Sequence, residues 1–405
     1  MLAQMLTMHE VYKAIVLMLV LAACTREQTV SPKPTPESAR EAILETFSVP
    51  TRPPLIPTVD TSQHSVPLDQ IYFDTFNPAN RAVPLDQATP ELVERLIDAI
   101  PPIHAPKYEP AAAADWLDDE DMIIGYATGE QAWAYPIRIL NFHEIVNENL
   151  GGEPVLISYC PLCFSGIVYS RRLGDQVLTF GNTSALYESD MVMLDYETGS
   201  YWWQVPGQAI VGPLTGEQLE ILPSTVTTWR GWRELHPDTQ VLSRDTGFER
   251  NYDRDPFASY AEILDGGRFA FPVGEAARDP RLSPATVVLA LKVEGTAVAY
   301  PLEASAPSVI HDEVGGIPVA IFLDPGSRTG AAFHPVAAGE LLHFDWTEAG
   351  PIDENTGSLW DLAGRAIDGP LSGEQLKPLP TKTSFWFAIV AAEPNIEIRG
   401  TVDGN

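Results

Sequence analysis

The sequence contains few cysteines and few basic residues for a chain of its length. Only 3 of the 405 residues are cysteine, and 25 Lys and Arg stand against 55 Asp and Glu, for a formal net charge of -30 at pH 7. Nucleic-acid binding needs a basic surface that contacts phosphates, so this charge argues against a nucleic-acid partner. An acidic surface of this size favours solubility through repulsion between molecules.

Motifs of several common enzyme classes are also absent. There is no phosphate-binding loop, no dinucleotide fingerprint, no serine nucleophile elbow and no Cys-X-X-Cys-His haem site. What the chain does have is Cys160 and Cys163, in a Cys-Pro-Leu-Cys stretch between apolar runs that predict strands over 155–159 and 166–171. Any thiol chemistry of the folded part is therefore expected in this one loop.

The third cysteine, Cys24, ends a targeting signal. Lys13 precedes an apolar run over 14–21 that is too short to span a bilayer, and Leu-Ala-Ala-Cys follows. This order resembles a bacterial lipobox, in which the cysteine is lipidated and becomes the mature N-terminus. We predict a lipoprotein signal peptide over 1–24, export to the cell envelope, and membrane association through the lipid anchor. A plain secretory signal is the alternative.

Proline-rich sequence over 25–65 predicts an extended tether. Residues 66–120 are predicted to be an N-terminal extension that packs on the body. Within it, Thr89 and Pro90 are start signals for a helix over 89–97. A chain of 405 residues exceeds what one hydrophobic core usually serves, so two domains or an internal duplication are expected.

The body of the chain contains an internal repeat, in which matched blocks recur in the same order. We predict one copy over 121–244 and a second over 286–400, joined by a connector over 245–285 that is rich in Gly, Pro and Asp. The matched blocks are 134–136 with 299–301, 151–155 with 315–319, 197–200 with 355–358, 212–219 with 369–376, and Pro223 and Trp229 with Pro380 and Trp386.

Local patterns predict a mainly β fold. Strands are expected over 122–126 and 132–135 around a hairpin turn at 129–130, and over 177–180 beyond the cysteine loop. Short helices are predicted over 111–117 and 141–150. The predicted class is mainly β with short helices (α+β), built as two tandem repeats of one antiparallel β-rich unit.

The two copies differ where chemistry would be expected. Aligned through the Gly-Gly pair, Cys160 falls opposite Asp324 and Cys163 falls opposite Ser327, so the second copy keeps the loop and lacks the thiols. The second copy is also shorter in the region that matches 182–193 of the first. Residues kept in both copies, such as the pairs Trp202 with Trp360 and Asp195 with Asp353, are expected to serve packing and turns.

Three interpretations of the cysteine pair are open. A redox-active dithiol is favoured by the two-residue spacing, which can lower a thiolate pKa and permits disulfide exchange. A metal site would need further ligands, for which His143, Asp190 and Met191 of the first copy are candidates; sulfur ligands suit copper(I), and Cys with His and Asp suits zinc. A structural disulfide in an exported protein is the third.

The quoted motifs together resemble those of the bacterial domain-of-unknown-function 3179 family. The stretches that carry the resemblance are 134–140, 143–147, 159–163 and 254–257, and the match extends from about residue 66 to the C-terminus. The resemblance implies an exported protein, often a lipoprotein. Some family members have selenocysteine in this loop, which implies a redox role for Cys160 and Cys163. It carries over no settled activity.

The leading hypothesis is a thiol redox centre resembling a thiol-disulfide oxidoreductase. Cys160 would be the attacking thiolate and Cys163 the resolving one, with His143 as a tuning or proton-donating residue, and a protein thiol as partner. A copper- or zinc-binding carrier module and a non-catalytic interaction lipoprotein remain as alternatives. Neither cofactor nor reaction follows from the sequence.

Overall fold

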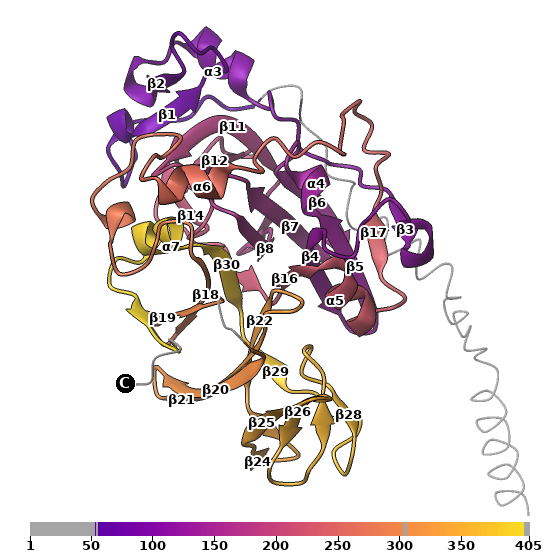
Figure 1. Cartoon of the computed structure of the whole chain (residues 1–405). Coiled ribbons are helices and arrows are strands. Elements are labelled where there is room, and N and C mark those ends of the chain that lie inside the picture. The colour runs from indigo at the N-terminus through magenta and orange to yellow at the C-terminus, as the bar shows by residue number, and fades with distance from the viewer. Residues whose placement is uncertain (1–52, 54–55, 303–305, 401–405) are drawn as a thin grey trace, which may run out of the picture. The chain divides into compact units, whose positions relative to one another are not determined.

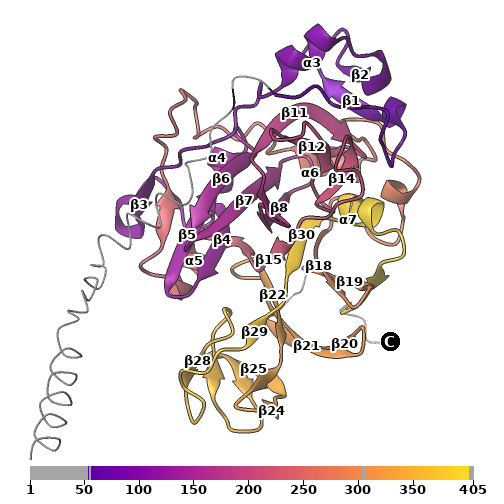
Figure 2. The same ribbon diagram turned by 180° about the vertical axis from the view of Figure 1, so that it is seen from behind.

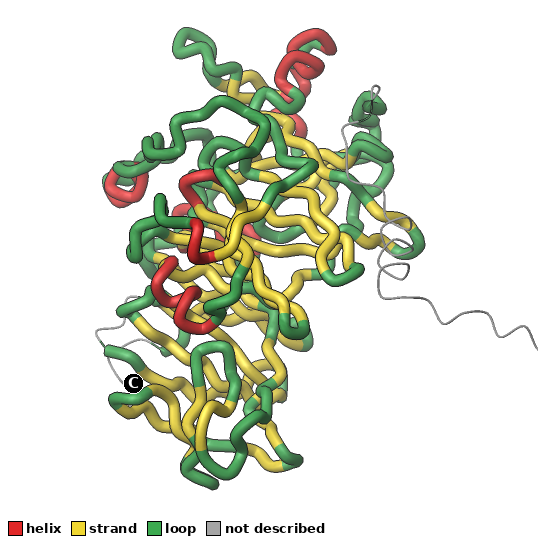
Figure 3. The backbone as a smooth tube through the Cα atoms, turned by 90° about the vertical axis from the view of Figure 1, so that its right-hand side faces the viewer, coloured by secondary structure: helices red, strands yellow, loops and turns green. Residues whose placement is uncertain are grey.

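The computed structural model describes residues 53, 56–302 and 306–400, and these described residues belong to one compact unit. Strands dominate and the helices are short (Figure 3). The predicted class, mainly β with short helices, is therefore confirmed. Among the described residues, no helix has both the length and the apolar character that a membrane crossing requires.

The N-terminal part of the described chain packs on the sheet that follows it. Strand β1 pairs with β11 in antiparallel fashion, Ile71 opposite Tyr187. The predicted helix is present as α3, because Thr89 accepts a hydrogen bond from the N–H of Leu92 at 3.3 Å and Pro90 occupies the first helical turn. The elements are η1 (Leu68–Gln70), β1 (Ile71–Asp74), β2 (Ala82–Pro84), η2 (Leu85–Gln87), α3 (Pro90–Leu96), β3 (Tyr108–Pro110) and η3 (Ala111–Ala113).

The first half of the body contains the predicted strands on both sides of the cysteine loop. Its elements are β4 (Met122–Thr128), β5 (Gln131–Pro136), α4 (Ile137–Leu140), β6 (Ile145–Leu150), β7 (Glu153–Cys160), β8 (Ser165–Ser170), β9 (Arg172–Leu173), β10 (Gln176–Val177), β11 (Phe180–Tyr187), β12 (Asp190–Asp195), β13 (Tyr201–Trp203), β14 (Gln208–Val211), β15 (Ile221–Leu222), β16 (Thr225–Thr228), α5 (Trp229–Leu235) and β17 (Gln240–Leu242).

The connector and the second half complete the chain. Their elements are α6 (Tyr260–Asp265), η4 (Ala276–Arg278), β18 (Val287–Val293), β19 (Thr296–Pro301), β20 (Ser308–Val314), β21 (Ile317–Asp324), β22 (Thr329–His334), β23 (Val336–Ala337), β24 (Glu340–Leu341), β25 (Phe344–Thr347), β26 (Gly350–Asp353), β27 (Leu359–Trp360), β28 (Ala366–Asp368), β29 (Lys377–Pro378), β30 (Thr381–Phe385), α7 (Trp386–Ala392) and β31 (Glu397–Ile398).

The pairing of the strands follows the same pattern in both halves. The hairpin β4–β5 is extended by β16 and, in parallel, by β17; the hairpin β18–β19 is extended by β30 and, in parallel, by β31. Trp202 donates to Asp195 and Trp360 donates to Asp353, each at 2.9 Å. These correspondences support the tandem repeat, which stays a prediction.

The helix predicted over 141–150 is wrong. Helix α4 ends at Leu140, Glu144 takes a positive φ of 58°, and β6 then pairs with β7, Ile145 opposite Ser158. The β-branched Ile145 and Val146 are both fully buried against that strand, so tertiary packing overrides the local helical pattern. The helix predicted over 111–117 is reduced to the single 3-10 turn η3.

The two halves meet in one mixed sheet, in which β30 of the second half lies beside β8 of the first (Figures 1 and 2). The only pairing between these strands in the ladder is Thr383 opposite Gly166. A Cβ atom on Gly166 would lie 2.7 Å from Ile124 Cγ1, so glycine is needed for the close approach. The contact places the end of β30 against the cysteine loop.

Candidate thiol site

The cysteine loop is a tight turn between β7 and β8, held from the other half of the chain. Cys160 ends β7, and the N–H of Cys163 donates to the Cys160 carbonyl at 3.1 Å. The Cys163 carbonyl in turn accepts from the N–H of Phe385 at 2.8 Å and from Ser384 Oγ at 2.9 Å. The backbone that carries both thiols is therefore fixed by the start of α7 as well as by its own strands.

The two thiols are free, buried and close together. Cys160 is 2% exposed and Cys163 is 0% exposed, and their sulfur atoms share a hydrogen bond at 3.3 Å. A disulfide bond requires about 2.05 Å between the sulfur atoms. The two sulfur atoms are therefore in contact but not bonded, about 1.3 Å further apart than in a disulfide.

A buried carboxyl group lies behind Cys163. Cys163 Sγ donates to Asp190 Oδ1 at 3.2 Å, and Asp190 Oδ2 accepts from the N–H of Val205 at 2.9 Å. Burial raises the pKa of Asp190 to about 6. Asp190 opens β12 directly after a turn in which Glu188 and Ser189 both have positive φ, so the hairpin β11–β12 delivers the carboxyl group to the thiols.

The environment keeps both thiols protonated at rest. Burial raises the pKa of Cys160, although its hydrogen bond with Cys163 lowers the pKa again in part. Burial raises the pKa of Cys163 much further, and the nearby Asp190 carboxylate adds to the effect. Cys160 is thus the more acidic of the two, and deprotonation of Cys163 needs an adjacent proton acceptor.

Cys160 lines a cavity of about 250 Å³, and Cys163 does not. Glu144 faces the same cavity and accepts a hydrogen bond from Asn182 Nδ2 at 2.6 Å. Burial raises the pKa of Glu144 to about 8, so this group is mostly neutral at pH 7. The mouth of the cavity includes Arg81, whose guanidinium lies 4.8 Å from the centre of a phenylalanine ring that also lines the cavity.

His143 lies outside this group of side chains. Its Nδ1 is 2.8 Å from the carbonyl of Pro101, and its Nε2 is 2.7 Å from the hydroxyl of Tyr252. Burial lowers the pKa of His143 to about 4, so the ring is neutral at pH 7. Both ring nitrogens are engaged in positioning the backbone around the site, and neither faces a thiol.

Of the residues predicted as metal ligands, the structure brings three together. The ligand atoms of Cys160, Cys163 and Asp190 all lie within 4.8 Å of one another, the single such group of three or more in the described part of the chain. Met191 lines the cavity beside Cys160, and its sulfur accepts from Asn182 at 3.6 Å. Cys24 lies outside the described residues.

The sequence reasoning did not single out Asn182, Arg81 or the role of Glu144. Asn182 could have been identified from the sequence, because it opens the stretch 182–193, where the second copy is shorter. Glu144 was considered only as the neighbour of His143. Arg81 comes from a segment about 80 residues before the loop, and no local pattern connects the two.

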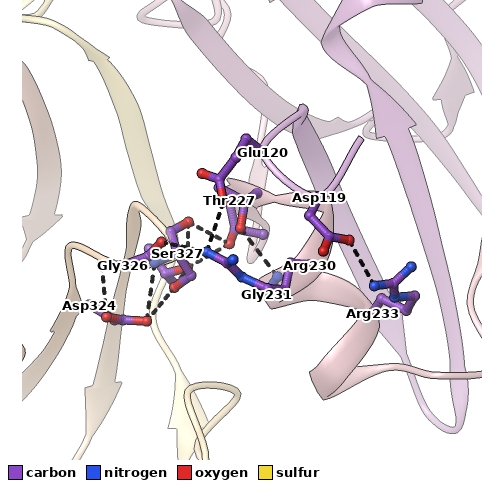
Figure 4. A network of polar contacts seen from close by, with 11 residues as sticks. Asp119, Glu120, Thr227, Arg230, Gly231, Arg233, Asp324, Gly326 and Ser327 are labelled. Carbon is purple, nitrogen blue, oxygen red and sulfur yellow. Dashed lines mark hydrogen bonds and ion pairs between the residues drawn. The ribbon is translucent and has the colours of Figure 1, made fainter. Parts of the chain in front are cut away.

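The loop between β21 and β22, which the predicted repeat aligns with the cysteine loop, is polar (Figure 4). Asp324 accepts hydrogen bonds from the N–H of Gly326 at 3.0 Å and from Ser327 Oγ at 2.6 Å. The Ser327 carbonyl accepts from the N–H of Thr228 at 3.0 Å and from Thr227 Oγ1 at 3.0 Å. Both loops thus bind the start of a helix that belongs to the other half.

Comparison with known proteins gives one match. The model of the family described as "Protein of unknown function (DUF3179)" matches residues 97–396, which is most of the chain and includes the cysteine loop, the β11–β12 hairpin and β30. Neither the curated proteins nor the solved structures contain a match. The chain therefore belongs to the DUF3179 family.

Proposed function

We propose that Cys160 and Cys163 form an extracytoplasmic dithiol centre that exchanges with disulfides. The observation that carries the proposal is the row of three groups in contact: two sulfur atoms at 3.3 Å and the Asp190 carboxyl group at 3.2 Å from the second. A purely structural disulfide needs neither a cavity at one sulfur nor a carboxyl group at the other. An exchange centre uses both.

The exchange proceeds in two steps. Cys160, which faces the cavity, attacks one sulfur of the incoming disulfide, so that a mixed disulfide forms and one thiolate leaves. Cys163 then transfers its proton to Asp190 and attacks Cys160 Sγ, which releases the second thiolate and leaves the Cys160–Cys163 disulfide. Two electrons pass to the substrate, and the two thiol protons end on its two released sulfur atoms. The reverse sequence oxidises a substrate dithiol.

A redox titration tests this proposal. The full chain is equilibrated in glutathione buffers of graded potential, free thiols are alkylated, and the reduced fraction is read by mass spectrometry. We expect one two-electron transition with a midpoint above about −300 mV, whereas a structural disulfide would have a midpoint below that value. Cysteines that stay reduced in the most oxidising buffer would rule out exchange.

A metal site is the second candidate, favoured by the close grouping of Cys160, Cys163 and Asp190. Two thiolates and a carboxylate suit zinc, and the nearby Met191 sulfur would favour copper(I). The test is metal analysis of protein purified without a metal-affinity tag. One equivalent of metal in the parent protein, absent from Cys160→Ser, would support a metal site, and a metal-free parent protein that still shows the redox transition would support exchange.

We also propose that the protein acts outside the cytoplasm, held to a membrane by lipid on Cys24. The support is the Leu-Ala-Ala-Cys sequence that follows the apolar run. Replacement of Cys24 by Ser should move the protein from the membrane fraction to the soluble exported fraction. A Cys24→Ser protein that remains in the membrane fraction at the parent level would contradict the lipid anchor.

A further inference from the structure

A second cavity, of about 430 Å³, includes neither cysteine in its lining. It is bounded by β18, β30, α7 and the stretch 205–221. Its walls are mostly apolar, and several of them are core side chains less than 3% exposed. The apolar lining residues include Val205, Leu219, Ile221, Ala290, Ile389 and Ile396.

One cationic side chain in this cavity has no partner. Lys382 lies on β30 opposite Ala290 and is partly buried. Within the described residues its ammonium group has neither a hydrogen bond nor an ion pair. The nearest carboxylate of the lining, Glu393, is already bound to Lys292, whose Nζ is 2.6 Å from Glu393 Oε1. An ammonium group held in apolar surroundings without a partner is unfavourable unless a ligand supplies one.

A related cavity of about 390 Å³, called here the first-half cavity because it is bounded by β4 and β16, is also lined by residues of the stretch 331–381 and provides a comparison. Thr225 stands there opposite Gly125 of β4, where Lys382 stands opposite Ala290 of β18. The cation of that cavity, Arg365, is engaged by Asp361 at 2.7 Å. A partly buried ammonium group without a partner is thus a property of the second-half cavity, and the first-half cavity serves as its control.

We propose that this cavity binds a small monocarboxylate with an aliphatic body, with the carboxylate on Lys382 and the chain along the apolar wall. The volume lies within the range of about 300–1,000 Å³ that is usual for small-molecule sites. A carboxylate supplies the charge and the hydrogen-bond acceptors that the ammonium group lacks. A neutral ligand of the same shape would make only the contacts with the apolar wall.

The charge of Lys382 sets the pH range of binding. Burial lowers the pKa of Lys382 to about 8, so the empty site holds an ammonium group at pH 7 and loses it as the pH rises above 8. Affinity for a carboxylate is therefore expected to be full near pH 7 and to fall above pH 8. The charged groups facing Lys382 are Lys292 on β18, Glu393 after α7, Glu220 before β15 and Asp190 on β12.

The test uses octanoate and 1-octanol as probes for the full chain in isothermal titration calorimetry. Octanoate should bind more tightly than octanol at pH 7, and Lys382→Met should weaken octanoate by about tenfold or more while changing octanol by less than about twofold. Lys377→Met, which removes an exposed cation of β29 outside this cavity, serves as the matched control and should retain octanoate binding. Raising the pH to 10 should reproduce the effect of Lys382→Met.

Three results would overturn the proposal: no octanoate binding, equal affinity for octanoate and octanol, or equal loss in the two lysine variants. A cooperative thermal transition of Lys382→Met, measured beside the titration, shows whether the variant is folded. The cavity does not include either cysteine, so Cys160→Ser should bind octanoate like the parent chain. The outcome is therefore independent of the redox proposal.

Discussion

The loop at 160–163 and the loop at 324–327 sit in matching places and do different things. In each loop, the carbonyl of the last residue accepts a hydrogen bond from a backbone N–H and another from a hydroxyl group. These donors lie at the end of a strand of the other half, β30 for the loop at 160–163 and β16 for the loop at 324–327. The polar loop satisfies its own side chains, since Ser327 donates to Asp324 within the turn. In the thiol loop the two sulfur atoms share a hydrogen bond, and Cys163 in addition donates to Asp190, which lies outside the loop. The hydrogen bonds that both loops share hold the scaffold together. The side chains in which the loops differ mark the place of the proposed thiol chemistry.

The hairpins that follow the two loops differ in the same sense. β11 and β12 have 8 and 6 residues, whereas β25 and β26 have 4 each. The longer hairpin carries Asn182, Asp190 and Met191 to the thiols. The half that carries the two thiols is therefore also the half with the longer hairpin.

Removing both thiols should have the largest effect on the difference between the loop at 160–163 and the loop at 324–327. In Cys160→Ser/Cys163→Ser, the response of the described part of the chain to glutathione buffers should disappear, since it holds no other cysteine; the remaining cysteine, Cys24, is the proposed lipidation site. The shared carbonyl contacts remain, so the variant should still unfold cooperatively. Thiol titration and circular dichroism measure the two properties. A redox transition that survives in this variant would show that the redox-active site lies outside the loop at 160–163.

Asp190→Asn should have the next largest effect, because it changes the step in which Cys163 attacks the mixed disulfide. Asn cannot accept the Cys163 proton, so decay of the mixed disulfide should slow by about 100-fold, as is usual for loss of a general base. In the parent protein the rate should rise as the pH increases through about 6, where Asp190 loses its proton, and the variant should lose that rise. Stopped-flow thiol release measures both. An unchanged pH profile would leave Asp190 with a structural role only.

Glu144→Gln should change the pH dependence of stability. The folded-state pKa of Glu144 is about 8 against an ordinary 4.5, so its contribution to stability is complete below 4.5 and is lost as the pH rises to 8. The neutral Gln cannot lose a proton. The unfolding free energy of the variant relative to the parent should therefore rise between pH 4.5 and 8, by at most about 1.4 kcal/mol per pH unit. Urea titrations at several pH values measure this difference, and a pH-independent difference would contradict the assigned protonation.

The smallest effects, on stability and on the midpoint potential, are expected for the matched pair of variants Ser384→Ala and Thr227→Ala. Each removes one hydroxyl that donates to a loop carbonyl, that of Cys163 or that of Ser327, and each should cost about 1 kcal/mol of stability. Only Ser384→Ala should also shift the midpoint potential, because only its loop carries the thiols. Equal shifts in both variants would mean that the potential responds to general loosening of the fold.

The sequence predicted the strands and turns next to the thiols because these depend on local patterns. The hairpin at 129–130 and the strands on both sides of the cysteine loop are where the alternation and turn residues placed them. The helix over 141–150 failed because β6 is stabilised by pairing with β7, a contact that no local pattern reveals.

The site itself was predictable only in part. Asp190 could be named because its stretch is missing from the second half, and it does meet Cys163. His143 was named because the second copy has no histidine at that position and histidine can act as a base or ligand, but its ring turns to Pro101 and Tyr252. Arg81 reaches the cavity from the turn between β1 and β2, and several helices and strands lie between it and the thiols along the chain. Such convergence depends on tertiary packing.

The most direct test of the exchange centre is a trapping experiment with glutathione disulfide on the two single cysteine variants. Cys163→Ser should accumulate a stable mixed disulfide on Cys160, because the cavity reaches Cys160 and the resolving thiol is gone. Cys160→Ser should remain unmodified, because Cys163 is fully buried. Intact-protein mass spectrometry reads both. Modification of Cys163 in preference to Cys160, or of neither, would contradict the account.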